Sequence, residues 1–182
     1  MEKVTEAHWQ NWDGDAVETL TLRETEEAIL AEGTITSRGK QIYIARYEIV
    51  CDITWRTKKC EIEIKQKREK LELESDGFGR WSNKSGPLLE LKGAIDIDIS
   101  ATPFTNMLPI RRLKLAKNQS EEISVVYVSV PELKVSLERQ RYTCLIPGRL
   151  YRFEQFDIGF SREIETGENG LVRVYPGLFK RL

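Results

Sequence analysis

Histidine, cysteine and long apolar runs are all scarce in this chain of 182 residues. His8 is the only histidine, so a zinc site is not expected. The three cysteines, Cys51, Cys60 and Cys144, are odd in number and lack CxxC spacing, so we expect reduced thiols packed as small hydrophobes. No segment approaches the ~20 apolar residues of a membrane span, and the N-terminal MEKVTEAHWQNW has no signal-peptide core. These absences predict a cytoplasmic protein without integral membrane association.

An excess of charge of either sign is also missing. Lys and Arg number 28 against 29 Asp and Glu, so the net charge of -1 gives no electrostatic footprint for nucleic acid. Basic clusters such as Lys58-Lys59 and Lys65 to Lys70 alternate with Glu and indicate solvated strand faces. The length predicts a single β-barrel-like domain over residues 1–182, and nothing in the sequence indicates a cofactor or a metal.

The dominant pattern is a period of two residues, which is typical of strands. Alternate positions from Tyr43 to Trp55 are apolar, with charged residues among those between them. CEIEIKQ and KLELES repeat the pattern on either side of Lys67 and Arg68, which suit a hairpin turn. Strand-like alternation returns in IDIDIS, EISVVYVSV and the segments that follow. No long stretch has a helical period, so we expect only one or two short helical turns, near Thr102 to Met107 and at Glu2 to Trp9.

The number of strands predicts the architecture. About ten to twelve short strands in meander order fit this length, and one antiparallel sheet of that size must curl to cover its apolar face and edges. We therefore predict an all-β fold, a single curved antiparallel sheet that forms a half-closed or closed barrel. A barrel of more than about eight strands generally leaves a cavity, which is a first indication of ligand binding.

The segment from Thr102 to Leu113, TPFTNMLPIRRL, is the least ordinary part of the chain. Thr102 and Pro103 suit the start of a short helical turn, and Pro109 is expected to stop it, so a strand should begin near Ile110. In that strand Arg111 would lie on the apolar face and Arg112 on the opposite one. A charge on the apolar face needs acceptors, so Arg111 either closes a structural ion pair or binds a ligand.

Two further features carry candidate site residues. The corner DGFGRW, with Gly77 and Gly79 at alternate positions, predicts a tight turn where backbone approaches backbone or ligand. Trp81 then fits an aromatic plug better than a stacking platform for a sugar ring. Asp96 and Asp98 face water if the isoleucines of IDIDIS face the core; if the strand is covered on both sides, they face the cavity as partners for an arginine.

These motifs, together with QRYTCL and the terminal GLVRVYPGLFKRL, resemble a family of bacterial proteins described as putative glycolipid-binding. The resemblance covers residues 28–182 and implies an incomplete antiparallel barrel of the lipoprotein-carrier type that binds a glycolipid or similar amphiphile. Ala94 stands where a cysteine would be expected. The matching residues are Gly77, Gly79, Trp81, Asp96, Asp98, Thr102, Pro103, Asn106, Leu108, Pro109, Ile110, Arg111, Arg112, Leu113, Gln140, Tyr142, Tyr175, Pro176 and Arg181.

The sequence thus favours a noncatalytic binding protein whose partner is an amphiphilic small molecule. An elongated pocket would take the apolar part of the ligand, and Arg111, backed by Asp96 or Asp98, would hold a polar or anionic head. One alternative is a hydrolase or isomerase acting on a small carbohydrate or lipid with Asp96 and Asp98 as acid and base. Another is a structural or interaction protein with a buried Arg-Asp network. The candidate ligand-binding residues are Trp81, Asp96, Asp98, Asn106, Arg111, Arg112, Gln140 and Tyr142.

Overall fold

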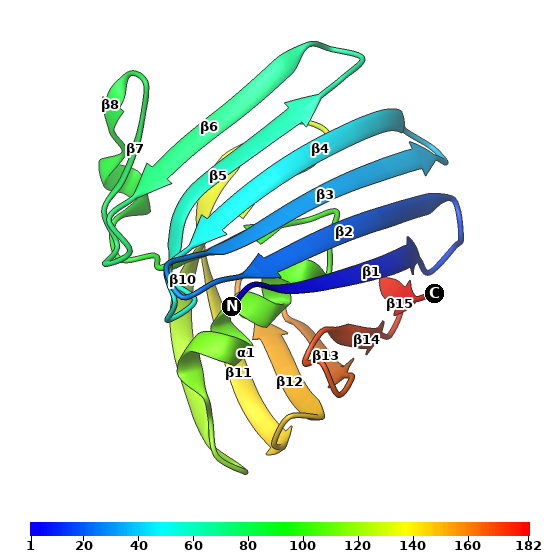
Figure 1. The fold of residues 1–182 in the computed structure, drawn as a ribbon, viewed down its shortest axis with the longest axis vertical. Coiled ribbons are helices and arrows are strands. Elements are labelled where there is room, and N and C mark those ends of the chain that lie inside the picture. The colour runs from blue at the N-terminus through cyan, green and yellow to red at the C-terminus, as the bar shows by residue number, and fades with distance from the viewer.

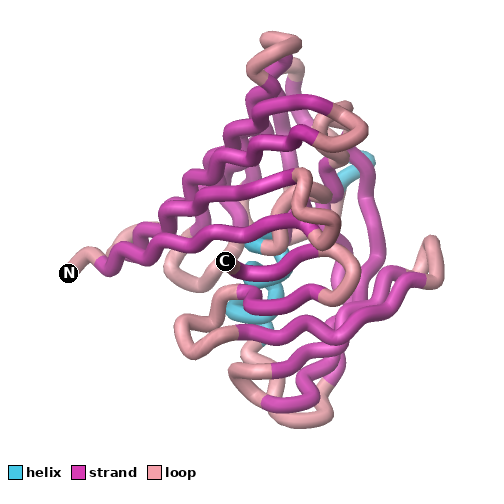
Figure 2. The backbone as a smooth tube through the Cα atoms, turned by 90° about the vertical axis from the view of Figure 1, so that its right-hand side faces the viewer, coloured by secondary structure: helices cyan, strands magenta, loops and turns pink.

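The computed structural model describes residues 1–182 as one continuous sheet with a short helix in its curve (Figures 1 and 2). Two 3₁₀ turns, η1 (Leu89–Leu91) and η2 (Phe104–Asn106), and one α-helix, α1 (Met107–Leu113), complete the secondary structure. The strands are β1 (Lys3–Asn11), β2 (Ala16–Glu24), β3 (Ile29–Arg38), β4 (Ile42–Cys51), β5 (Thr57–Ile64), β6 (Glu69–Ser75), β7 (Trp81–Asn83), β8 (Gly86–Pro87), β9 (Asp96–Ile99), β10 (Ser120–Val128), β11 (Val135–Ile146), β12 (Leu150–Gln155), β13 (Phe160–Thr166), β14 (Val172–Tyr175) and β15 (Phe179–Arg181).

The sheet consists of two meanders joined by the chain termini. Its order is β8-β7-β6-β5-β4-β3-β2-β1-β15-β14-β13-β12-β11-β10-β9, so the first strand pairs with the last. Strands β8 and β9 are the two edges, and the sheet is not closed into a barrel. All pairs are antiparallel except β9 with β10, which is parallel. The all-β class is confirmed, whereas the prediction of a purely antiparallel sheet is wrong because of this one pair.

Fifteen strands exceed the predicted ten to twelve, and short strands account for part of the difference. β7, β8 and β15 contain two or three residues each, too few to show alternation. The helical turn expected at Glu2 to Trp9 is wrong because this segment lies in β1, where Ala7 and Trp9 face the core. The other inward positions of β1 carry too little apolar surface for the alternation of apolar and polar residues to be visible in the sequence.

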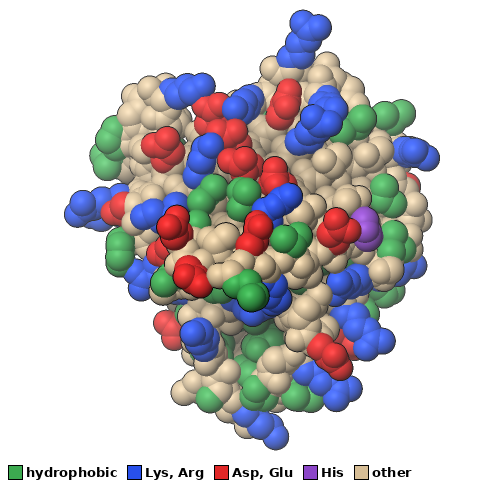
Figure 3. Space-filling view, in the orientation of Figure 1, with side chains coloured by type: hydrophobic (Ala, Val, Ile, Leu, Met, Phe, Trp, Pro, Cys, Tyr) green, Lys and Arg blue, Asp and Glu red, His purple; other side chains and the backbone are tan.

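The outer face of β2 to β6 carries the charges that the sequence interleaves. Lys70 lies 3.0 Å from Glu61 and 2.5 Å from Glu72, and Arg23 lies 2.9 Å from Glu32. Figure 3 shows acidic and basic side chains mixed over this face. The prediction of solvated strand faces is confirmed for Lys59 and Lys70, whereas Lys65 to Arg68 form the turn between β5 and β6.

The segment Thr102 to Leu113 differs most from expectation. A 3₁₀ turn forms at η2 as predicted, and Thr102 Oγ1 accepts a hydrogen bond from the Phe104 amide at 3.0 Å. The chain then continues as α1 through Pro109 instead of leaving as a strand. Pro109 is the third residue of α1, where an amide has no partner within the helix, so its missing donor costs little. The helix ends at Lys114, whose φ of 48° is left-handed.

Helix α1 and η2 fill the inside of the curved sheet. Phe104, Met107 and Leu108 are fully buried and join one core cluster with residues from both meanders, such as Leu20 and Ile164. The elongated lumen expected from the strand number is therefore occupied by the chain itself. Neither α1 nor the 3₁₀ turns are long and apolar enough to cross a membrane.

Two smaller predictions are confirmed. Cys51, Cys60 and Cys144 are free and buried. At the glycine corner, the Gly93 amide donates to the Gly79 carbonyl at 2.8 Å, so two backbone segments meet where no side chain intervenes.

This contact yields a test of the fold. A Cβ at Gly79 would lie 2.8 Å from Gly93 Cα, and Gly79 has a φ of +95°, whereas Gly14 has a φ of +80° and nothing within 4 Å. Gly14→Ala should lower the free energy of unfolding by about 1 kcal/mol through backbone strain alone. Gly79→Ala should lower it by about 2–4 kcal/mol because a steric clash is added. Urea unfolding measures both values, and equal losses would contradict the close approach.

Candidate binding pocket

A pocket of about 220 Å³ lies between the segment that leads from β9 into η2 and the meander of β10 to β15. We refer to it as the binding pocket. Its polar floor comes from β9, η2, the segment between them and β12; its wall is mainly aromatic; and its mouth is formed by two hairpin turns. The floor consists of Asp98, Ser100, Thr102, Asn106 and Gln155; the wall of Ile99, Tyr127, Phe153, Phe160, Tyr175 and Phe179; and the mouth of Ile158 and Leu178.

The carboxylate of Asp98 is the charged group of the floor. Gln140 Nε2 donates to Oδ2 at 2.6 Å, and Thr105 Oγ1 donates to Oδ1 at 3.1 Å. Burial raises the pKa of Asp98 above its ordinary value, and nearby Glu138 adds to the rise, whereas the two hydrogen bonds oppose it. Both oxygens are positioned by protein donors and retain lone pairs for a ligand.

Behind Asp98, a buried chain of hydrogen bonds fixes the floor. Asn106 Nδ2 donates to the Tyr142 hydroxyl at 3.0 Å, and that hydroxyl lies 3.5 Å from Gln140 Oε1. With its oxygen toward Tyr142, Gln140 presents its amide nitrogen to Asp98. The three side chains are almost fully buried, so they orient the floor instead of lining it, except for Asn106, which reaches the pocket.

The aromatic wall is a series of rings in edge contact. Phe153 packs against Phe160 and Tyr175, each with centroids 6.1 Å apart, and Tyr175 lies 6.3 Å from Phe179. Tilted ring pairs of this kind form a stiff surface. Sequence reasoning missed this wall, although the aromatic positions of YRFEQFDIGF were visible as a local signal.

Asp96 and Arg112 form a buried ion pair beside the pocket. Arg112 donates through Nε to Oδ1 at 3.1 Å and through Nη2 to Oδ2 at 2.6 Å. Asp96 is completely buried, which raises its pKa, and Arg112 counteracts that rise. The expectation that Arg111 would take the carboxylate is wrong because the segment is helical, so strand parity does not apply to the two arginines.

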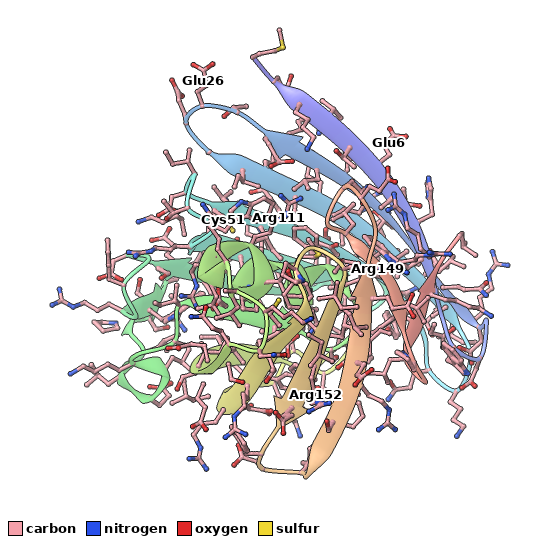
Figure 4. The ribbon with its side chains drawn as sticks, turned by 90° about the horizontal axis from the view of Figure 1, so that it is seen from below. Glu6, Glu26, Cys51, Arg111, Arg149 and Arg152 are labelled. Carbon is pink, nitrogen blue, oxygen red and sulfur yellow. The ribbon has the colours of Figure 1, made fainter.

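Arg111 and Trp81 lie away from the binding pocket. Arg111 Nη2 donates to the Asn169 carbonyl at 2.6 Å, and its guanidinium sits 5.1 Å from the Trp55 ring centroid; its place on α1 can be seen in Figure 4. Trp81 Nε1 donates to the Ala94 carbonyl at 2.7 Å, in the role of a buried plug. Of the eight predicted site residues, only Asp98 and Asn106 line the pocket, and Asp96, Arg112, Gln140 and Tyr142 support it.

A second buried carboxylate stands behind the floor. Glu18 Oε1 accepts hydrogen bonds from Thr102 Oγ1 at 2.7 Å and from the Tyr47 hydroxyl at 2.5 Å, while its Oε2 has no partner. The Tyr47 ring crosses over Gly33, where a Cβ would lie 2.1 Å from it. Burial raises the pKa of Glu18 to about 7. No sequence pattern marked Glu18, because it occupies an inward position of β2 that the flanking leucines would predict to be apolar.

A larger hollow of about 500 Å³ lies on the outer face of β2 to β6. Its lining includes the Arg23–Glu32 and Lys70–Glu61 pairs, and Tyr47 is its only hydrophobic residue. This hollow offers an amphiphile no apolar wall, so the binding pocket is the better candidate.

The ion pair can be tested by double substitution. Arg112→Met should lower the free energy of unfolding by about 3–5 kcal/mol because Asp96 would remain buried and unpaired. Adding Asp96→Asn should restore a large part of that loss. Arg111→Met removes only a carbonyl partner and a ring contact, so it should cost about 1–2 kcal/mol. Denaturant unfolding of the four proteins measures these effects; a larger loss for Arg111→Met would contradict the assignment.

Glu18 should give the protein a characteristic pH dependence. Its pKa rises from 4.5 to about 7 on folding, so the folded state binds the proton more tightly than the unfolded chain. Its contribution to stability is therefore complete below about pH 4.5 and is lost as the pH rises through about 7. Relative to Glu18→Gln, the wild-type free energy of unfolding should fall by about 3 kcal/mol across this window. Urea unfolding at a series of pH values tests this, and a flat difference would refute it.

Comparisons with known proteins agree with this architecture. The family model described as "Putative glycolipid-binding" matches residues 6–181. The crystal structure of a DUF1089 family protein from Pseudomonas aeruginosa is 34% identical, with 92% of each chain covered and a TM-score of 0.80. No curated protein matches the chain. Because the family model spans nearly the whole sequence, the chain belongs to the family described as putative glycolipid-binding.

Proposed function

We propose that this protein binds a glycolipid or a similar amphiphile without catalysis, with the sugar head in the binding pocket and the alkyl part at its mouth. The observation that carries the proposal is the combination of one positioned carboxylate and a wall of aromatic rings in a single pocket. The family's description supports the same ligand class.

The size of the pocket favours a head group over a whole lipid. Pockets for drug-sized ligands span roughly 300–1,000 Å³. At about 220 Å³, the binding pocket suits one ring-sized group, and the interior that could have held an alkyl chain is filled by η2 and α1. This reverses the orientation expected from the sequence, in which the apolar part entered the protein.

The chemistry of the pocket suits a sugar ring. Asp98 accepts hydrogen bonds from hydroxyl groups. Asn106 and Gln155, whose amide nitrogens donate to Tyr142 and Glu138, add side-chain carbonyl oxygens as further acceptors at the same floor. The faces and edges of Phe160 and Tyr175 provide an apolar surface for the C–H groups of the ring.

The charges favour a neutral head. Asp98 lies near Glu138 and Asp96, both of which raise its pKa, so the floor is electronegative when Asp98 is ionised. Neither Arg111 nor Arg112 reaches the pocket, because Arg112 is held by Asp96 and Arg111 by Asn169. The cation that borders the pocket is Arg162, whose guanidinium lies 4.7 Å from the centroid of the wall ring Phe160. At the floor, ionised Asp98 would repel a phosphate or sulfate head, where the sequence led us to expect a guanidinium.

The mouth can take the start of an alkyl chain. Ile158 is 68% exposed and Leu178 is 37% exposed, and both border the pocket. Exposed apolar side chains at the entrance to a polar floor match the two parts of an amphiphile. The hydrolase alternative has less support, because Asp98 is the only carboxylate that lines the pocket and Asp96 is fully engaged by Arg112.

Calorimetric titration with octyl glucoside below its critical micelle concentration tests the proposal. Asp98→Asn keeps the shape of the side chain but removes its charge, so affinity should fall about 10-fold or more as charge-assisted hydrogen bonds are lost. Glu121→Gln, at an exposed carboxylate of β10, is the matched control and should bind like the wild type.

Octyl phosphate provides the comparison of head groups. The wild type should bind it more weakly than octyl glucoside. Preference for the phosphate, or equal binding of octyl glucoside by the wild type and Asp98→Asn, would rule the assignment out.

A further inference from the structure

The topology brings six turns to one end of the strands. In a meander every second turn lies at the same end, and the pairing of β1 with β15 joins the two meanders in this respect. We define the open rim as the turns at residues 12–15, 39–41, 65–68, 129–134, 156–159 and 176–178. Figure 1 shows the β1–β2, β3–β4 and β5–β6 turns along the right-hand and upper edge.

Exposed apolar side chains stand on or beside four of these turns. Ile42 is 76% exposed, Ile158 68%, Trp12 46% and Leu178 37%. The Trp12 amide donates to the Leu178 carbonyl at 2.8 Å, so two of these side chains come from neighbouring turns. The open rim therefore presents large apolar groups to solvent at several points.

One corner of the open rim is basic. Its turns carry Lys40, Lys65, Lys67 and Arg68, all exposed and none in a salt bridge. Cations along the strands behave differently, since Lys59 and Lys70 each contact two glutamates. We name these four residues the basic corner. Lys67 Nζ donates to the Pro131 carbonyl at 3.4 Å, but no carboxylate pairs with any of the four, so their charges are available for an external partner.

Carboxylates nearby do not neutralise the basic corner. Asp15 approaches the β3–β4 turn at Gly39, Glu69 starts β6, and Glu132 accepts a hydrogen bond from Gln41 at 3.0 Å. None of the three forms a salt bridge with the basic corner, and exposed Arg38 at the end of β3 adds a fifth cation. Elsewhere on the open rim Asp13 follows Trp12 and Asp157 precedes Ile158, so the excess of positive charge is confined to the basic corner.

Neighbouring hollows lie along the open rim between the basic corner and the binding pocket. A pocket of about 250 Å³ at the corner is lined by Ile42, Tyr43 and Ile64, among others. It shares Gln41 and Tyr43 with a hollow of about 490 Å³, which in turn shares Ser100 and Phe179 with the binding pocket. The basic corner and the binding pocket thus belong to the same rim, with a hollow between them.

We propose that the open rim docks on the surface of an anionic lipid bilayer. The basic corner contacts lipid phosphates, and the apolar side chains of Trp12, Ile42, Ile158 and Leu178 enter the boundary between head groups and acyl chains. Both contributions are the ones that hold peripheral proteins at anionic membranes. Docking would place the mouth of the binding pocket at the lipid surface, and only this last point rests on the proposed function.

Tryptophan fluorescence offers a direct test because Trp12 is the only exposed tryptophan. Trp9, Trp55 and Trp81 are at most 7% exposed. Vesicles of phosphatidylcholine with about one third phosphatidylglycerol, free of glycolipid, should shift the emission to the blue, and brominated acyl chains should quench it. Pure phosphatidylcholine vesicles should have little effect, and Trp12→Phe should abolish the shift.

Charge variants separate docking from nonspecific attraction. Substituting the four residues of the basic corner by Gln should weaken sedimentation with the anionic vesicles by about 100-fold or more. The matched control replaces Lys92, Lys114, Lys117 and Arg149 by Gln; these exposed cations lie outside the open rim and form no salt bridge, so binding should change only slightly.

Three results would overturn docking: equal losses in the two quadruple variants, binding without any change at Trp12, or tighter binding to soluble heparin than to vesicles. The last would indicate a site for soluble polyanions. Because the vesicles lack glycolipid, Asp98→Asn should bind them normally. If the protein fails to bind the vesicles but still binds octyl glucoside, docking is wrong and the proposed function stands. If it binds the vesicles but not octyl glucoside, the proposed function is wrong and docking stands.

Discussion

The parallel pairing of β9 with β10 is the constraint on which the rest of the molecule depends. Parallel neighbours need a crossover connection, and the residues between Ile99 and Ser120 provide one by passing through η2 and α1. The crossover lies on the concave side, where it covers the apolar face that an open sheet of fifteen strands would otherwise expose. The buried Asp96–Arg112 ion pair joins the edge strand β9 to α1 and so fixes the position of the helix inside the sheet.

The crossover also decides where a ligand can bind. With α1 inside the sheet, space remains where the chain enters the crossover, beside Asp98, Thr102 and Asn106. The residues that carry the fold signature therefore have two kinds of role. Arg112 and Pro109 belong to helix α1, whereas Asp98 and Asn106 face the pocket that the helix leaves open. Family signatures of this sort mix structural and ligand-facing positions, and only geometry separates them.

Much of the fold could be predicted from the sequence because strands with one wet face show a period of two. The central strands and the β5–β6 hairpin follow that rule, and the family resemblance is confirmed over nearly the whole chain. The helix was missed because Pro109 reads as a stop signal unless its position within the first turn is known. The partners of Arg111 and Arg112 depend on that helix, and the aromatic wall depends on strand register across three hairpins, so neither could be derived locally.

The distribution of charge keeps the two proposed sites, the binding pocket and the basic corner, apart. An electronegative floor with Asp98 repels phosphates, so the same pocket cannot attract the protein to an anionic lipid surface. The unpaired cations lie instead on the β3–β4 and β5–β6 turns, beside the hollows farther along the open rim. Attraction to a surface acts over about a Debye length and needs no fixed geometry, whereas selection of a neutral head needs contact. With the two proposed sites on opposite parts of one rim, anionic lipids would hold the protein without competing for the pocket.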